Sequence, residues 1–161
     1  MIFVTVGTNE APFDRLLSAL SSLEGHELLV QHGSSPIRPA GARCVESLPY
    51  DEVVETMRRA DTVVTHAGVG SVLTAFAAGK RPVVVPRLRR FSEAVDDHQV
   101  EFARHLAPTA LVSLVEDLGE LPQAVASSPG GISLDIGPSS RLVNELRAYL
   151  EATLGPVPHS R

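Results

Sequence analysis

Short apolar segments alternate along the chain with stretches whose apolar residues recur at helical spacing. Residues 2–6 form a nearly continuous apolar run, as expected of a strand that is buried on both faces. The stretch 13–23 follows, with Leu16, Leu17 and Leu20 on one helical face. This alternation predicts βαβ units around a parallel sheet.

The same pattern continues through the rest of the chain. Further strands are expected at 27–31, 42–47, 62–65, 82–85 and 110–113. Further helices are expected at 50–59, 71–78, 97–106, 117–126 and 141–154, the fourth of these with Pro122 inside it. The sequence therefore predicts an α/β fold with one doubly wound parallel sheet, in a single domain over residues 1–154. A loop at 127–140 and a flexible tail at 155–161 complete the expected organisation.

Composition narrows the class of protein. The formal net charge of −5 argues against a nucleic-acid binder, whose surface is usually basic. The single cysteine, Cys44, excludes an internal disulfide and any metal site built from several cysteines. The chain begins directly with a strand-like segment and carries no apolar run of about 20 residues, so we expect neither a signal peptide nor a membrane span. A cytoplasmic protein is the expectation.

Polar residues gather in the loops that follow the expected strands. In doubly wound sheets, ligands bind beyond the carboxyl ends of the strands, where these loops meet. The loops in question cover residues 7–10, 31–35, 48–50, 66–71 and 87–99. Their shared position indicates one binding site.

The strongest single motif is HAGVGS at residues 66–71, between a strand and a helix. Its glycines would let a phosphate approach the backbone, and Ser71 would cap the helix and offer a hydroxyl. The motif lacks the G-K-[ST] ending of a Walker A loop, and Leu73 stands where a dinucleotide fingerprint has its third glycine. A tight turn without a ligand remains the alternative reading.

Other loop residues allow two readings each. Residues 7–9, Gly-Thr-Asn, form either a simple turn or a second phosphate-facing loop. Asp96 and Asp97 fit a helix N-cap, which leaves His98 and Gln99 without a capping role. The basic run at 87–90 fits a solvated surface, or a contact with a diphosphate, an anionic lipid head group or an acidic partner. No nucleophile–base arrangement and no metal site is indicated.

Three segments together resemble a known family. HAGVGSVLTAFAAGKRPVVVPR, the later DDHQVEFARHL and the N-terminal MIFVTVGT resemble the donor-binding half of family 28 glycosyltransferases of GT-B fold. Within that family the chain is similar to the stand-alone subunits of bacterial exopolysaccharide glycosyltransferases. It is also similar to the catalytic subunit of the eukaryotic dolichol-linked N-acetylglucosamine transferase. The resemblance is close over residues 1–110.

The resemblance implies half of an enzyme. Such a subunit binds a UDP-sugar, and a membrane-associated partner subunit carries the acceptor domain. The pair transfers the sugar with inversion to a lipid-linked acceptor in polysaccharide or glycolipid synthesis. No cofactor or metal is implied beyond the UDP-sugar donor. The complex would lie at the inner face of the membrane, and this chain would touch the membrane only through its partner. The length of 161 residues, about half of a two-domain enzyme, fits this expectation.

The resemblance also assigns roles to residues. One group would approach the donor diphosphate from two loops, Leu48 would recognise the uracil edge through its backbone, and His98 and Gln99 would contact the sugar hydroxyls. The diphosphate group is Gly7, Thr8, Asn9, Gly68, Val69, Gly70 and Ser71.

Two positions qualify this picture. Many relatives place a ribose-binding glutamate where this chain has Thr74, which cannot make a charge-assisted hydrogen bond. The partner is the favoured source of a general base, with His66 as the local candidate. The alternatives are a non-catalytic nucleotide-sugar-binding regulatory subunit, an epimerase or hydrolase that uses the same half-fold, and a domain that binds another phosphate compound.

Overall fold

The computed structural model describes residues 1–128, 144 and 148–149. The expected loop at 127–140 and final helix at 141–154 lie largely outside this part, and the tail at 155–161 lies wholly outside it.

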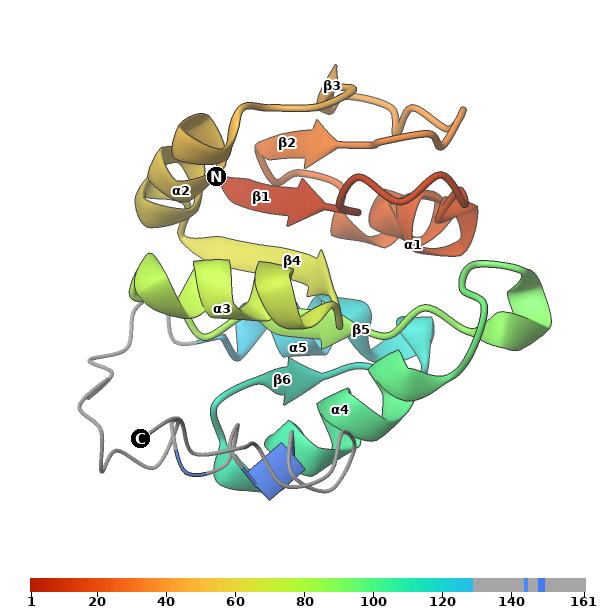
Figure 1. Ribbon diagram of the computed structural model, residues 1–161. Coiled ribbons are helices and arrows are strands. Elements are labelled where there is room, and N and C mark those ends of the chain that lie inside the picture. The colour runs from red at the N-terminus through yellow and green to blue at the C-terminus, as the bar shows by residue number, and fades with distance from the viewer. Residues whose placement is uncertain (129–143, 145–147, 150–161) are drawn as a thin grey trace.

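A six-stranded sheet forms the centre of the molecule (Figure 1). Its strands are β1 (Ile2–Thr5), β2 (Leu28–Gln31), β3 (Arg43–Val45), β4 (Thr62–His66), β5 (Val83–Val85) and β6 (Ser113–Leu114). The spatial order is β3-β2-β1-β4-β5-β6, and every pairing between neighbours is parallel. This is a Rossmann-like, doubly wound topology. Strands β1 to β3 are added toward one edge of the sheet and β4 to β6 toward the other, so the topology reverses between β1 and β4. The fold predicted from the sequence is therefore confirmed.

The strands bury side chains on both faces of the sheet. Along β1, Ile2 and Val4 belong to one core cluster and Phe3 belongs to another on the opposite face. Along β4, Val64 and Val63 divide between the same two clusters. Helices must cover both faces of such a sheet, which is why the strands read as nearly continuous apolar runs.

The helices divide between these two faces. Helix α1 (Asp14–Ala19), with the 3-10 turn η1 (Leu20–Leu23), and helix α5 (Leu121–Ala126) pack in the first cluster. Helices α2 (Tyr50–Arg59), α3 (Val69–Ala77) and α4 (His98–Leu106) supply the clusters of the other face. Three further 3-10 turns are η2 (Arg89–Phe91), η3 (Ala107–Thr109) and η4 (Leu118–Glu120).

Several boundaries differ from those that the sequence predicts. Helix α3 starts two residues early, so Gly70 and Ser71 belong to its first turn. Asp97 rather than Asp96 holds the N-cap position of α4, although Asp96 Oδ1 still accepts the His98 N–H at 3.1 Å. Pro122 lies at the start of α5, where a missing N–H costs nothing, because the expected helix is divided by η4.

The last strand also differs from the expectation of 110–113. Ala110 has a left-handed conformation, with φ of 61°, at the end of η3, and the pairing with β5 starts only at Ser113. The expected C-terminus of α3 is confirmed, because Gly79 has a φ of 73° and its N–H donates to Phe76 O.

Candidate functional site

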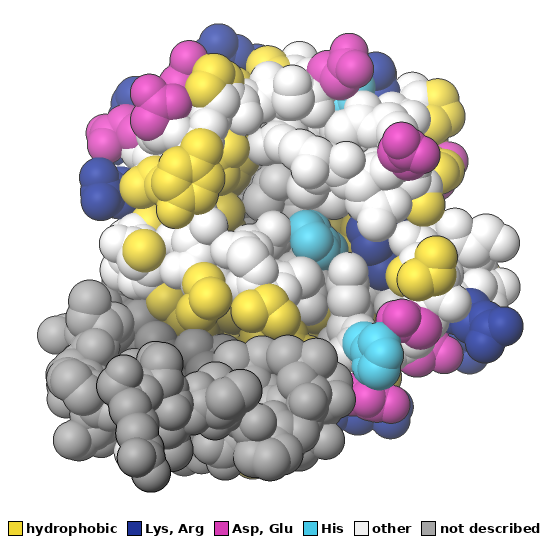
Figure 2. All heavy atoms as spheres, viewed as in Figure 1, with side chains coloured by type: hydrophobic (Ala, Val, Ile, Leu, Met, Phe, Trp, Pro, Cys, Tyr) yellow, Lys and Arg dark blue, Asp and Glu magenta, His cyan; other side chains and the backbone are white. Residues whose placement is uncertain are grey.

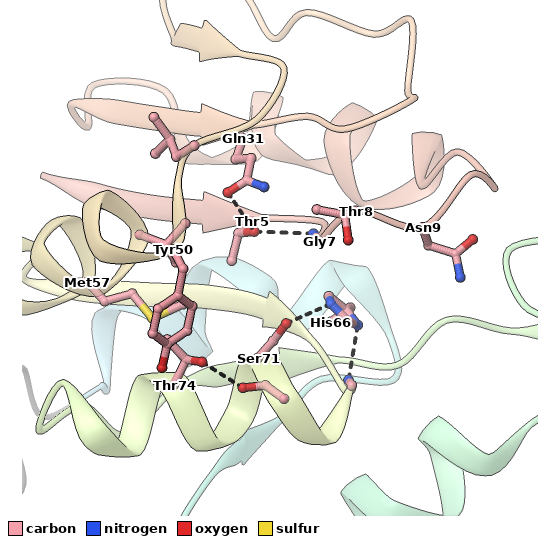
Figure 3. A pocket seen from close by; sticks show the side chains of 14 residues that line it. Thr5, Gly7, Thr8, Asn9, Gln31, Tyr50, Met57, His66, Ser71 and Thr74 are labelled. Carbon is pink, nitrogen blue, oxygen red and sulfur yellow. Dashed lines mark hydrogen bonds between the residues drawn. The ribbon is translucent and has the colours of Figure 1, made fainter.

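A cavity of about 680 Å³ opens where β1 and β4 end, at the point where the sheet topology reverses (Figure 3). Figure 2 shows the same region as a hollow with a histidine side chain inside it. This volume falls in the range of small-molecule sites, and the position is the one where doubly wound sheets bind their ligands.

His66, the last residue of β4, lies between the two glycine loops. A Cβ added at Gly7 would come within 2.5 Å of His66 Nε2, and one added at Gly68 would overlap the same imidazole. Gly7 also has a φ of 74°, which side-chain-bearing residues rarely adopt. At these two positions, glycine makes room for His66 rather than for a ligand.

The hydrogen bonds of His66 fix its tautomer. Nδ1 accepts the N–H of Gly68 at 3.0 Å, so this nitrogen carries no proton. The proton of the neutral ring therefore lies on Nε2, which is 2.8 Å from Ser71 Oγ and donates to it. As a consequence, the hydroxyl hydrogen of Ser71 is free to point toward a ligand in the cavity.

Burial keeps this histidine neutral. It lowers the pKa of His66 from 6.5 to about 4, and the positive charge of Arg87 acts in the same direction, against a weaker opposite effect of Gln99. The ring gains a proton only well below neutral pH. To accept a proton from a substrate hydroxyl near pH 7, it would need a much higher pKa.

The N-terminus of α3 faces the cavity with unused donors. Gly68 caps the helix without a side-chain hydrogen bond, and its own N–H goes to His66. The N–H groups of the first helical turn, which have no partner within the helix, are thus available to a ligand. A Cβ at Gly70 would meet no atom within 4 Å, so the open space lies at this glycine. A phosphate group suits such a helix terminus.

The opposite end of the cavity is mainly apolar. Leu48, Tyr50, Val53 and Met57, from α2 and the residues before it, line this end. Thr74 lies across from them on α3, one turn beyond Gly70. The cavity thus offers N–H and O–H donors at one end and an apolar wall with one aromatic ring at the other.

Most of the site residues expected from the sequence line this cavity. They are Gly7, Thr8, Asn9, Leu48, His66, Gly68, Gly70, Ser71 and Thr74. Val69 belongs to the same helical turn as Gly70 but does not line the cavity, and 37% of its surface is exposed.

His98 and Gln99 lie at the start of α4, outside the cavity lining. The exposed ring of His98 is near two carboxylates, 3.7 Å from Asp96 and 3.4 Å from Glu101. Gln99 Oε1 accepts the N–H of Arg87 at 3.2 Å and so helps to hold the loop after β5.

Sequence reasoning assigned no binding role to three polar or aromatic residues of the lining, although it placed two of them in loops at the site. Thr5 and Gln31 form the floor at the ends of β1 and β2, with Thr5 Oγ1 3.4 Å from Gln31 Oε1. Thr5 interrupts the apolar run at 2–6, and Gln31 ends the one at 27–31. A polar residue at such a position was the signal in the sequence that could have indicated a site. Tyr50 was expected at the end of one of the site loops and as the first residue of a helix, but without a role in binding.

Arg87 is a structural residue and not a solvated one. Its side chain is 1% exposed, and its guanidinium donates to the carbonyl oxygens of Val6, Ala11 and Glu93 at 2.8–3.1 Å. Glu93 is buried as well and pairs with Arg15 through two contacts of 3.0 Å. These contacts tie the loop after β1 to the loop after β5 and so position one side of the cavity.

The fold and the cavity together define a class of protein, a doubly wound α/β domain with a helix N-terminus that opens into a cavity at its topological switch point. The family is defined by a sequence match. Residues 1–128 match the model of the glycosyltransferase family 28 C-terminal domain, and the chain belongs to this family.

Two curated relatives carry the same name, UDP-N-acetylglucosamine transferase subunit ALG13. The one from Yarrowia lipolytica is 34% identical over an alignment of 122 positions, which covers 66% of this chain and 60% of the relative. The human one is 32% identical over an alignment of 119 positions, which covers 65% of this chain and 10% of the relative. The matched part of this chain thus spans less than two thirds of the length of each relative, and only a tenth of the human one.

A solved structure supports the fold. The glycosyltransferase of kitacinnamycin superposes with a TM-score of 0.56 at 21% identity, over 92% of this chain and 39% of that one.

Among the described helices, none combines the length and the apolar character that a membrane crossing needs. Within the same part of the chain, no three His, Cys, Asp or Glu side chains gather as a metal site would require.

Proposed function

We propose that this chain is the donor-binding, catalytic subunit of a two-subunit inverting glycosyltransferase. The pair would move a sugar from a UDP-sugar to a lipid-linked acceptor. The observation that carries the proposal is the two-ended cavity, with open helix N–H groups and a serine hydroxyl at one end and an apolar wall at the other. A nucleoside diphosphate has the matching polarity along its length. The names of the relatives support a UDP-sugar donor and a subunit role.

The cavity suggests how the donor would lie. The diphosphate would sit at Gly70 and Ser71, with the loop at Gly7 on the other side. The uridine would point toward Leu48, and the sugar would extend past the cavity toward His98 and Gln99, which do not line it. Thr8 and Asn9 would flank the diphosphate, while Val69 would contribute only its backbone N–H.

The reaction needs stabilisation of the leaving group. The acceptor hydroxyl oxygen forms a bond to the anomeric carbon from the face opposite the diphosphate, and the bond from that carbon to the diphosphate oxygen breaks. The helix terminus and the Ser71 hydroxyl would hydrogen-bond the diphosphate while its negative charge grows. His66 would orient Ser71 by donating through Nε2.

The acceptor proton must pass to a general base. His66 is the local candidate, but its lowered pKa and its two engaged nitrogens favour the orienting role. We therefore assign the base to the acceptor-binding partner. That partner would be membrane-associated and would hold this cytoplasmic chain at the inner face of the membrane.

The test is transfer by the reconstituted pair. The full chain is purified with the membrane subunit that accompanies it, and transfer of labelled N-acetylglucosamine from its UDP donor to lipid is measured. We expect transfer only when both chains are present, and a loss of about tenfold or more in Ser71→Ala, because this change removes a diphosphate donor. Ser18→Ala, at an exposed position on α1, is the matched control.

Two outcomes would contradict the proposal. Full-rate transfer by this chain alone would exclude the need for a partner. Unchanged transfer by Ser71→Ala would instead favour the regulatory-subunit alternative, because a scaffold tolerates the loss of donor contacts.

A further inference from the structure

Tyr50 is the most unusual residue of the cavity wall. It is the first residue of α2, and 70% of its surface is exposed although it is a large aromatic residue. It lies at i, i+3 and i+7 spacing with Val53 and Met57, so these three side chains share one helical face. In Figure 3 the ring extends from α2 over Met57 toward Thr74 on α3. The exposed ring and the apolar side chains beside it thus form one wall of the cavity that a flat ligand can contact.

Thr74 has little left to offer a ligand as a donor. Its hydroxyl already donates to the Gly70 carbonyl oxygen, at 2.8 Å, four residues earlier in the helix. Only the lone pairs of Thr74 Oγ1 remain for a group in the cavity. A ligand hydroxyl at this level therefore needs a second polar partner from another wall.

The position of Thr74 along α3 fits the layout of a nucleotide. Four residues of helix separate it from Gly70, which is about 6 Å along the helix axis. A diphosphate at the helix terminus would therefore place the ribose beside Thr74 and the base beside Val53 and Met57. The Tyr50 hydroxyl, which is both donor and acceptor, extends toward the same level.

We propose that Tyr50 is the nucleoside-binding residue of this site: its ring covers the base, and its hydroxyl hydrogen-bonds a ribose hydroxyl in place of a side chain on α3. The inference rests on the proposed function, since it assumes a nucleoside diphosphate in this cavity. It explains the exposure of Tyr50, because the ring becomes covered when the donor binds. It also assigns nucleotide specificity to α2, on the wall opposite the diphosphate-binding helix.

The test measures the affinity of the full chain for three probes by titration calorimetry. The probes are uridine diphosphate, 2′,3′-dideoxyuridine diphosphate and inorganic pyrophosphate, and the variants are Tyr50→Phe and Tyr50→Leu. Phe91→Leu is the matched control, because Phe91 is an aromatic residue with 52% exposure that lies outside the cavity lining.

Each variant has its own expected result. Tyr50→Leu should weaken uridine diphosphate by about tenfold or more, beyond the effect of Tyr50→Phe, because both the stacking ring and the hydroxyl are lost. It should leave pyrophosphate unchanged, because the diphosphate contacts remain. Tyr50→Phe should weaken uridine diphosphate about threefold to tenfold and should bind the dideoxy probe as the wild type does. Phe91→Leu should bind all three probes like the wild type.

The outcomes separate the two claims. If the wild type binds uridine diphosphate and both Tyr50 variants bind it within twofold of the wild type, the role of Tyr50 is refuted and the proposed function stands. If the wild type binds neither uridine diphosphate nor pyrophosphate, both the role of Tyr50 and the proposed function fail.

Discussion

Replacing Gly70 by alanine should stabilise the fold and weaken donor binding at the same time. Gly70 is the second residue of α3, it is not among the glycines with positive φ, and an added Cβ would meet no atom within 4 Å. Alanine in a helix interior is favoured over glycine by about 1 kcal/mol, and we expect about half of this in the first turn. That gain corresponds to a rise in melting temperature of about 1–2 °C for a chain of this size.

The same methyl group would occupy the space where a phosphate approaches the helix terminus. We expect it to weaken uridine diphosphate binding about tenfold, which is about 1.4 kcal/mol. Gly68→Ala is the informative contrast. Its Cβ would overlap His66, so this variant should lose about 1–3 kcal/mol of stability even without ligand.

The assay is thermal unfolding with and without uridine diphosphate, combined with calorimetric titration. A ligand at 100 times its dissociation constant stabilises a protein by about 2.7 kcal/mol, so the wild type should show a clear shift. Gly70→Ala should melt higher than the wild type without ligand and should show a smaller shift with it. A variant that binds uridine diphosphate like the wild type would refute the assignment of the diphosphate to this terminus.

Three further predictions concern the cavity lining and the loops that position it. The pKa of His66 is near 6.5 in the unfolded chain and about 4 in the folded one, so the free energy of unfolding should fall by about 3 kcal/mol as the pH drops through this window. Urea unfolding at several pH values measures this, and the loss should be smaller in His66→Gln. Parallel pH dependences of the wild type and this variant would contradict a buried neutral ring. Arg87→Met leaves four carbonyl oxygens without this donor and should cost about 3 kcal/mol. Arg90→Met, at an exposed position, should change stability by less than about 0.5 kcal/mol, and equal losses would be inconsistent with the buried contacts of Arg87. Thr74→Glu places a carboxylate beside the expected ribose and should tighten uridine diphosphate about threefold to tenfold in a calorimetric titration without tightening pyrophosphate; weaker binding of both would count against this placement.

The sequence predicts the fold well because two patterns are strong: continuous apolar runs at the strands, and apolar residues at helical spacing between them. The apolar runs at β1 and β4 leave little alternative to a buried parallel strand, and a parallel sheet requires helical crossovers. The weaker predictions fall at element ends. Ala110 takes a left-handed conformation that no local pattern announces, and the start of α3 depends on His66, which accepts the Gly68 N–H.

The candidate site is predicted in part, for a comparable reason. Gly70 and Ser71 come within five residues of the end of β4, so their place at the carboxyl edge of the sheet follows from chain order. The sequence does not show why glycine is needed at positions 7 and 68. The need arises from the His66 imidazole, which lies between Gly7 and Gly68 in space. Tyr50 reaches the cavity only because α2 packs beside α3, which is a tertiary fact.

The burial of Arg87 shows the same limit. A run with three arginines in four residues is typical of a solvated surface. Only the fold places carbonyl oxygens of Val6 and Ala11, about eighty residues earlier in the chain, around one of these guanidinium groups.

The central claim is that the diphosphate of a UDP-sugar binds at the N-terminus of α3. The most direct measurement is an amide NMR titration of the full chain with uridine diphosphate. The account predicts saturable shifts that are largest at the N–H groups of Gly7, Gly70 and Ser71, with no comparable shifts along α5. An absence of saturable shifts, or shifts centred away from this helix terminus, would contradict it.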